Sequence, residues 1–230
     1  IQANKMIVTI DGPAGAGKST IARQLADTLG FHFLDTGAMY RAVTLGAIRK
    51  QIDFADTALL ISHAQRATIE WQDTRLLLDR DDVTQEIRSP IVTDSIKHIA
   101  DIPEIRESLS DQQRRIAECQ NIVTEGRDQG TDVFPHAECK LFLTASPAER
   151  AKRRHQQLAD LGRPIPLEQI LEAQNRRDAE DRGRPRGTLR PADDAVIIHS
   201  DGLTFETVVE MMLDTVRKKM QSLQPEASEH

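Results

Sequence analysis

The sequence predicts an α/β protein in which a mostly parallel sheet is flanked by helices, with an inserted antiparallel subdomain and a helical lid. Short apolar segments alternate with helical patterns along most of the 230 residues, which is typical of a parallel sheet covered on both faces. The alternation stops at about 52–100, where two short strands follow each other directly and indicate antiparallel pairing. Two arginine-rich helical patterns at 147–190, separated by Gly162 and Pro164, indicate the lid.

The individual elements follow from the apolar pattern and from the residues at each end. Strands are expected in the core at 6–10, 31–35, 121–125, 140–143 and 195–198. Helices are expected at about 21–29, 37–50, 104–119, from 147, 167–181 and 204–220. Thr36 is expected to cap the second helix, and Ser146-Pro147-Ala148-Glu149 is a capping box with proline at the first helical position. The insert should hold strands at 69–71 and 75–78 and a turn at 79–82, while 183–192 should be a loop and 221–230 a frayed tail.

The composition is that of a globular protein, and it limits the classes of partner. A net charge of −6 gives no general attraction to nucleic acid or to an anionic membrane. An aromatic content of 3% disfavours a platform on which bases stack. No apolar run approaches the length of a membrane span, and the first residues pass into a strand without a secretory signal. We therefore expect a cytoplasmic protein without nucleic-acid or membrane partners, in which Cys119 and Cys139 are buried thiols. We also expect a monomer, although no feature of the sequence determines the oligomeric state.

One motif between the first strand and the first helix points to nucleotide chemistry. Residues 12–19, Gly-Pro-Ala-Gly-Ala-Gly-Lys-Ser, match the phosphate-binding P-loop pattern G-x-x-x-x-G-K-[ST]. Glycines allow the backbone to approach a phosphate, and the helix start supplies free N–H donors and partial positive charge. The ATP-binding residues are therefore predicted to be Gly12, Pro13, Ala14, Gly15, Ala16, Gly17, Lys18, Ser19 and Thr20. Lys18 would reach the β- and γ-phosphates, and Ser19 would join the Mg²⁺ shell. The alternative is a glycine-rich turn that binds nothing.

Other polar segments also follow predicted strands. Asp35-Thr36 comes after the second strand, and Glu125-Gly126-Arg127-Asp128 comes after the third. Because ligands of open parallel sheets gather at the carboxyl ends of the strands, these segments and the P-loop are expected at one edge. The P-loop alone does not say which molecule receives the phosphoryl group.

The segment 147–190 holds eleven lysines and arginines against seven acids, and ten of the eleven are arginine. Arginine is preferred where a planar, bidentate contact with phosphate is needed. We interpret the segment as a lid that brings cations to the transferring phosphoryl group and excludes water, with 153–155 through 163–164 at the turn of a helical hairpin. Two alternatives are a solvated helix face with pairs such as Glu149–Arg153, and a basic patch for nucleic acid.

Four motifs in order resemble the bacterial cytidylate kinases, which belong to the P-loop nucleoside monophosphate kinase superfamily. The resemblance runs from about residue 6 to 218. The motifs are 12–19, Leu34-Asp35-Thr36-Gly37-Ala38-Met39-Tyr40-Arg41, Glu125-Gly126-Arg127-Asp128-Gln129-Gly130-Thr131 and Arg177-Asp178-Ala179-Glu180-Asp181-Arg182. The resemblance implies transfer of the ATP γ-phosphoryl group to CMP or dCMP with Mg²⁺. It also implies one kinase domain with a core (about 1–51, 101–150 and 190–220), an insert that binds the nucleoside monophosphate (about 52–100) and a lid (about 151–186).

The resemblance also implies a role for individual residues. The residues implied in catalysis are Lys18, Arg127 and Arg184. The family positions that bind the phosphate of CMP correspond to Thr36, Arg41 and Arg127, and Tyr40 lies beside it. The positions that contact the cytosine correspond to Arg106 and Asp128, and those that contact the sugar correspond to Arg177 and Asp181. Ser19 and Glu125 would hold the metal. The family usually has an aspartate in place of Glu125, so Glu125 would bind the metal either directly or through water.

Some assignments keep an alternative. Lys97 stands where many members have a serine near the base; it could contact the base or face solvent, and Ser95 lies two residues earlier. Tyr40 could be a core residue, and Asp181 could only pair with Arg177 along one helix. At the level of function, the alternatives are a small P-loop kinase for shikimate, gluconate or another nucleoside, and a GTPase. The GTPase signature N-K-x-D is absent from the sequence.

Overall fold

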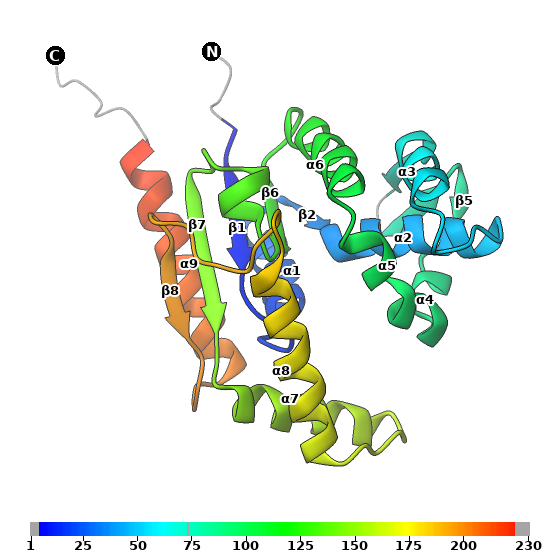
Figure 1. Cartoon of the computed structure of the whole chain (residues 1–230). Helices are drawn as coiled ribbons and strands as arrows, with labels where there is room; N and C mark the ends of the chain where they lie inside the picture. The colour runs from blue at the N-terminus through cyan, green and yellow to red at the C-terminus, as the bar shows by residue number, and fades with distance from the viewer. Residues whose placement is uncertain (1–4, 73, 224–230) are drawn as a thin grey trace, which may run out of the picture. The chain divides into compact units, whose positions relative to one another are not determined.

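The structure, a computed structural model, describes residues 5–72 and 74–223 (Figure 1). The chain divides into two compact units. Unit 1 contains the residues up to Leu34 together with those from Ala117 onward, and unit 2 contains Asp35–Ile116. The expected insert at 52–100 falls within unit 2, which also contains the flanking helices α2 (Thr36–Arg49) and almost all of α6 (Pro103–Ala117).

Unit 1 is built on a five-stranded sheet in the order β2-β6-β1-β7-β8. The strands are β1 (Ile7–Asp11), β2 (His32–Asp35), β6 (Ile122–Gly126), β7 (Cys139–Thr144) and β8 (Val196–His199), each within about two residues of its predicted range. β1 runs parallel to both β6 and β7, and Asp11 lies opposite Gly126 and Phe142. The P-loop and the Arg127-Asp128 segment therefore leave the sheet at the same edge, as predicted.

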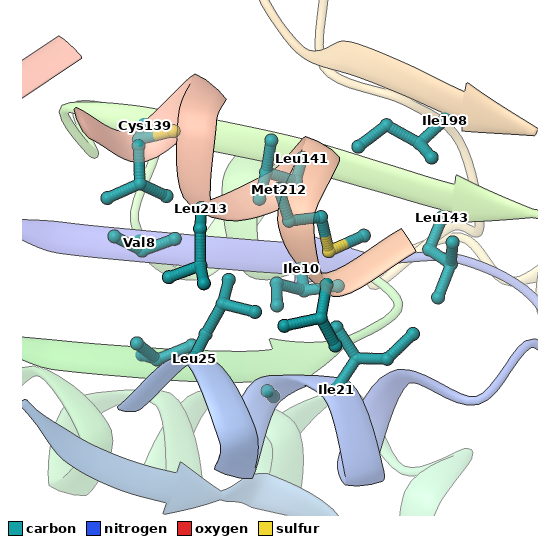
Figure 2. Packing of buried hydrophobic residues seen from close by; sticks show 14 of the residues in the cluster. Val8, Ile10, Ile21, Leu25, Cys139, Leu141, Leu143, Ile198, Met212 and Leu213 are labelled. Atoms are coloured by element: carbon teal, nitrogen blue, oxygen red, sulfur yellow. The ribbon is translucent and has the colours of Figure 1, made fainter. Parts of the chain in front are cut away.

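The core of unit 1 lies between this sheet and two helices, α1 (Lys18–Leu29) and α9 (Phe205–Leu223). Side chains from both helices point toward β1 and β7 in Figure 2, with Ile21 and Leu25 on α1 and Met212 and Leu213 on α9. The apolar positions of both helices recur at helical spacing, so one stripe of each is buried. Helix α9 extends to Leu223 rather than ending at 220, and residues 224–230 of the predicted tail lie outside the described residues.

Two helices form the predicted hairpin in unit 1, α7 (Pro147–Asp160) and α8 (Leu167–Gly183) (Figure 1). Ser146 caps α7 by accepting a hydrogen bond from the Glu149 N–H, with Pro147 at the first helical position. Only this half of the predicted capping box is confirmed, because the Ser146 N–H donates to Asp201 and the Glu149 carboxylate accepts from Arg153. The prediction for the turn was partly wrong. Residues 153–155 lie inside α7 because the helix continues to Asp160, and only 163–164 belong to the connection.

Unit 2 contains a three-stranded antiparallel sheet of β3 (Ile69–Gln72), β4 (Arg75–Leu78) and β5 (Asp81–Asp82). Its helical elements, besides α2 and α6, are α3 (Thr57–Arg66), the short η1 (Glu86–Arg88), α4 (Pro90–Ser95) and α5 (Lys97–Ala100). The predicted turn at 79–82 is wrong in its second half. Asp79 and Arg80 alone make the turn, with φ of 51° and 76°, and the next two residues pair with β4.

Three further local expectations are corrected or missed. The N-cap of α2 is Asp35, whose carboxylate accepts from the Ala38 N–H at 2.8 Å, and Thr36 is the first helical residue. Cys139 is buried as predicted, but Cys119, two residues after the end of α6, is exposed. A short π-helical segment, η2 (Gln129–Val133), follows β6 and was not predicted. Among the described residues, no helix is both long and apolar enough to cross a membrane.

Candidate active site

The P-loop takes a conformation that depends on glycine at three positions. Gly12, Gly15 and Gly17 have φ values of 148°, 77° and 91°, which side chains rarely allow. At Gly12 there is also no room, because an added Cβ would lie 2.0 Å from the carbonyl oxygen of Leu143. Gly17 precedes α1, and no side-chain hydrogen bond from it caps the helix start. The first N–H groups of α1 are therefore available as hydrogen-bond donors, and the N-terminus of the helix favours binding of an anion.

Lys18 is the first residue of α1, and its side chain folds back over the loop. It is 5% exposed, and its Nζ donates to the carbonyl oxygen of Pro13 at 2.8 Å. Burial and the positive charge of Arg127 lower the pKa of Lys18 to about 7, against the opposing charges of Glu125 and Asp11. The ammonium group therefore lacks a full counter-charge, and an incoming phosphate would supply one.

The two residues predicted to bind the metal, Ser19 and Glu125, are in contact in the structure. The Ser19 hydroxyl donates to Glu125 Oε1 at 2.8 Å, across 106 residues of sequence. Glu125 is buried near the end of β6. A hydroxyl and a carboxylate are both oxygen donors of the kind that Mg²⁺ prefers, with its other positions left to water and phosphate. The pair therefore fits a magnesium ion bound together with a nucleotide.

The sequence reasoning missed a buried carboxylate at the start of the P-loop. Asp11 is 3% exposed and accepts two hydrogen bonds, from Gln129 N at 2.8 Å and from Gly130 N at 2.7 Å. Burial raises its pKa to about 7 although both hydrogen bonds oppose the change. Asp11 thus joins the end of β1 to the segment directly after Arg127 and Asp128. An acidic residue at the end of an otherwise apolar strand was the available signal.

Asp181, near the end of α8, brings two of the predicted catalytic arginines together. Its carboxylate accepts from Arg127 Nε at 2.8 Å and pairs with an Arg184 nitrogen at 2.7 Å. Burial raises the pKa of Asp181, but the charges of Arg127 and Arg184 outweigh it and hold the pKa below its usual range. The alternative in which Asp181 only pairs with Arg177 is therefore wrong. Arg177 exposes part of its surface, but burial of its guanidinium group and the charge of Arg127 lower its pKa, and its own charge contributes to the lowered pKa of Lys18.

Four predicted CMP-binding residues belong to unit 2 and lie on two helices. Thr36 is buried at the start of α2, and Arg41 pairs with Asp35 at 3.6 Å. The guanidinium carbon of Arg106, on α6, lies 5.5 Å from the centre of the Tyr40 ring, and Arg106 also donates to the Ala100 carbonyl at 3.0 Å. Tyr40 is half-buried against this cation, which argues against a plain core role.

Two more predicted residues take different environments. Asp128 is buried in unit 1 immediately before η2. Lys97 is exposed on α5.

The parallel sheet carries a P-loop between β1 and α1, and the lysine of this loop is buried. Nearby, one carboxylate binds two arginines. Together these features define the protein as a P-loop kinase. The chain belongs to the cytidylate kinase family, whose model matches residues 8–218. It is 57% identical to the cytidylate kinase of Rhodopirellula baltica over 94% of this chain and 95% of that one. It is 45% identical to that of Caldanaerobacter subterraneus, over 92% and 94%.

A solved structure of an uncharacterized protein from Eubacterium ventriosum also shares the fold. Its TM-score is 0.52 at 13% identity, and the match covers 94% of this chain and 99% of that one. At this identity the likeness shows the fold alone, so the functional assignment rests on the family.

Proposed function

We propose that this chain transfers the γ-phosphoryl group of ATP to CMP and dCMP, in the presence of Mg²⁺, and releases ADP with CDP or dCDP. Membership of the cytidylate kinase family supports this reaction. The single structural observation that carries it is the cationic edge of unit 1. Lys18 lies there in the P-loop, and Asp181 holds Arg127 and Arg184 together.

For the donor, we propose that residues 12–20 bind the phosphates of ATP. The strained glycines and the uncapped start of α1 support this role, because backbone N–H groups and the helix dipole favour an anion. Lys18 would exchange its hydrogen bond to Pro13 for the β- and γ-phosphates. Ser19 and Glu125 would hold Mg²⁺, which neutralises charge on the transferred phosphoryl group when it is bound.

For the acceptor, each side chain has a role that matches its chemistry. We propose that Thr36, Arg41 and Arg127 bind the phosphate of CMP and that Tyr40 lies beside it. Arg177 and Asp181 would contact the sugar. Asp128 and Arg106 would read the cytosine, whose amino donor lies next to acceptors. A site with such hydrogen bonds rejects a base that lacks the amino donor, because its own polar groups then lose their partners.

The chemistry needs no covalent intermediate and no strong base. Two anionic phosphates must approach each other, and the proposed cations Lys18, Arg127 and Arg184 offset their repulsion and stabilise the transition state. In related phosphoryl transfers one such arginine contributes a factor of roughly 10³–10⁵ in rate. The remaining task is to hold donor and acceptor in line.

We also propose a role for each part of the chain, together with a cellular location and an oligomeric state. The core would bind ATP, the insert would carry the acceptor, and the α7–α8 hairpin would act as the lid that excludes water. The exposed connection at 161–166 supports the lid, because a segment that moves needs few buried contacts. A cytoplasmic monomer that uses only small-molecule nucleotides is the simplest form of such an enzyme.

The decisive test is an acceptor panel of AMP, GMP, UMP, CMP and dCMP in a coupled assay of ADP release. We expect the highest kcat/KM with CMP or dCMP, and Lys18→Ala should abolish turnover without changing the circular dichroism spectrum. A preference for AMP or GMP would overturn the proposal. Hydrolysis of GTP without any acceptor, at a higher rate than hydrolysis of ATP, would indicate a GTPase.

The base-reading role has its own test. Asp128→Ala should lower the ratio of kcat/KM for CMP to that for UMP, because the carboxylate that recognises the amino group is removed. Asp214→Ala removes an exposed carboxylate on α9 and should leave the ratio unchanged. An unchanged ratio in Asp128→Ala would show that another residue selects the base.

A further inference from the structure

Arg150 lies in the first turn of α7, and its side chain is 2% exposed. Each of its three nitrogens has a hydrogen-bond partner on a different segment. Nε donates to the carbonyl oxygen of Ala145 at 3.1 Å, one terminal nitrogen to that of Ala14 in the P-loop at 2.8 Å, and the other to Asp178 Oδ2 at 2.7 Å. The fork thus connects the end of β7, the P-loop and α8 through one side chain.

A second contact places α8 against the same part of the P-loop. Gln174, one turn before Asp178, donates from Nε2 to the backbone oxygen of Arg150 at 3.4 Å. The same Nε2 lies 2.7 Å from the position of a Cβ on Gly15, so the P-loop and α8 are in close contact there. Both Gln174 and Asp178 are buried. The part of the hairpin next to the P-loop is therefore fixed, in contrast to the exposed connection at 161–166.

Helix α8 also carries Asp181, three residues after Asp178, and Asp181 bonds Arg127 and Arg184. We propose that Arg150 is a positioning residue that ties α8 to the P-loop, so that the ATP-binding backbone and the arginines held by Asp181 keep one common register. The proposal rests on the proposed kinase reaction for its effect on turnover. Its effect on ATP binding does not depend on the acceptor.

Arg150 can position the arginines because helix α8 is held at two points, one on the P-loop and one on Arg127. Asp178 is held on Ala14 through Arg150, and Asp181 is held on Arg127. A displacement of α8 by about 1 Å would move the arginines relative to the bound phosphates, and misplacement of that size can lower a rate about 100-fold. Arg150 therefore acts on the chemistry without touching either nucleotide.

Loss of Arg150 alone would also leave a buried charge without its partner. The second oxygen of Asp178 has no hydrogen-bond partner among the described residues, so Arg150 supplies the counter-charge of this carboxylate. Removing one partner of a buried pair destabilises a protein, whereas replacing both by neutral groups is often harmless. The double variant Arg150→Met with Asp178→Asn therefore separates two effects of Arg150, its positioning of α8 against the P-loop and its contribution to the stability of the fold.

The experiment compares Arg150→Met, Arg150→Lys, Asp178→Asn and the double variant with wild type, at a temperature well below all melting points. Calorimetric titration gives the Kd for ATP without an acceptor, and a coupled assay gives kcat and KM with CMP. We expect the ATP Kd to rise at least tenfold and kcat to fall by about 100-fold in Arg150→Met. In the double variant the melting temperature should recover toward wild type while both functional losses persist.

Arg153→Met is the matched control, because Arg153 lies on the same helix and bonds Glu149 and Ser200 but not the P-loop. It should change the Kd and kcat less than threefold. Recovery of ATP affinity and kcat together with stability in the double variant would overturn the proposal, since Arg150 would then serve the fold alone. Failure of the wild type to phosphorylate CMP would instead contradict the proposed function and would leave the ATP-binding test valid.

Discussion

Replacement of Asp11 by asparagine should make the protein more stable at pH 8 and less active at the same pH. The folded protein raises the pKa of Asp11 from 3.8 to about 7, mainly by burial. Between these values the unfolded chain has released the proton while the folded chain keeps it, so the free energy of unfolding falls as the pH rises. Each pKa unit corresponds to about 1.4 kcal/mol, and by pH 8 the penalty is roughly 4 kcal/mol.

Asparagine carries no charge and escapes this penalty. Its amide cannot accept from both Gln129 N and Gly130 N, so one N–H loses its partner at a cost of about 1–3 kcal/mol at every pH. The difference in unfolding free energy between variant and wild type should therefore shift by roughly 2.5 kcal/mol toward the variant between pH 5 and pH 8. The loss of the anchor next to Arg127 and Asp128 should lower kcat about 10- to 100-fold.

Urea unfolding followed by far-ultraviolet circular dichroism at pH 5, 6, 7 and 8 measures this shift. Asp201→Asn is the control, because hydrogen bonds from the side chain and backbone of Ser146 hold the pKa of Asp201 below its usual range. Asp201 is ionised in both states across this window, so its variant should differ from wild type by a constant amount. A constant difference for Asp11→Asn would refute the reasoning, since the buried carboxylate would then be ionised throughout.

Two further substitutions test the geometry of the site. Gly12→Ala places a methyl group 2.0 Å from the Leu143 carbonyl oxygen, so we expect little soluble protein and no ATP binding, and a well-folded, active variant would contradict the geometry. Asp181→Asn removes the charge that Arg127 and Arg184 share, and it should lower the free energy of unfolding by about 3 kcal/mol and kcat at least tenfold. Urea unfolding and the coupled assay measure these losses, and an unchanged kcat would show that Asp181 does not position the arginines.

The sequence was sufficient for features that a short segment defines. The P-loop needs a strand, glycines and a helix in direct succession, and all three lie between residues 6 and 29. The N-cap at Ser146 is equally local, because its hydrogen bond spans three residues, whereas the other half of the expected capping box is replaced by a contact to Asp201, 55 residues away. Strand positions followed from apolar runs for the same reason, and they were correct to within about two residues.

The sequence predicted that the P-loop and the Glu125–Asp128 segment share one edge of the sheet, but it did not predict the individual long-range side-chain contacts. The two partners of Asp11 lie 118 and 119 residues away, and the P-loop partner of Arg150 lies 136 residues away. No spacing rule connects such positions, so Arg150 and Asp178 were merely counted among the charges of the lid segment. The cap of α2 failed for another reason, because Asp35 and Thr36 are both good caps and the chain uses the first.

The arginines that contact α8 divide into those with a structural partner and those that leave positive charge near the P-loop. Arg150 and Asp178 cancel each other within a buried pair. Asp181, in contrast, is shared by Arg127 and Arg184, and Lys18 lies close enough for Arg127 to lower its pKa. The cluster of Asp181, Arg127 and Arg184 therefore carries a positive surplus, in a chain with a net charge of −6. That surplus is unfavourable until an anion arrives, so a nucleotide that binds there gains the relief of the repulsion in addition to its own contacts.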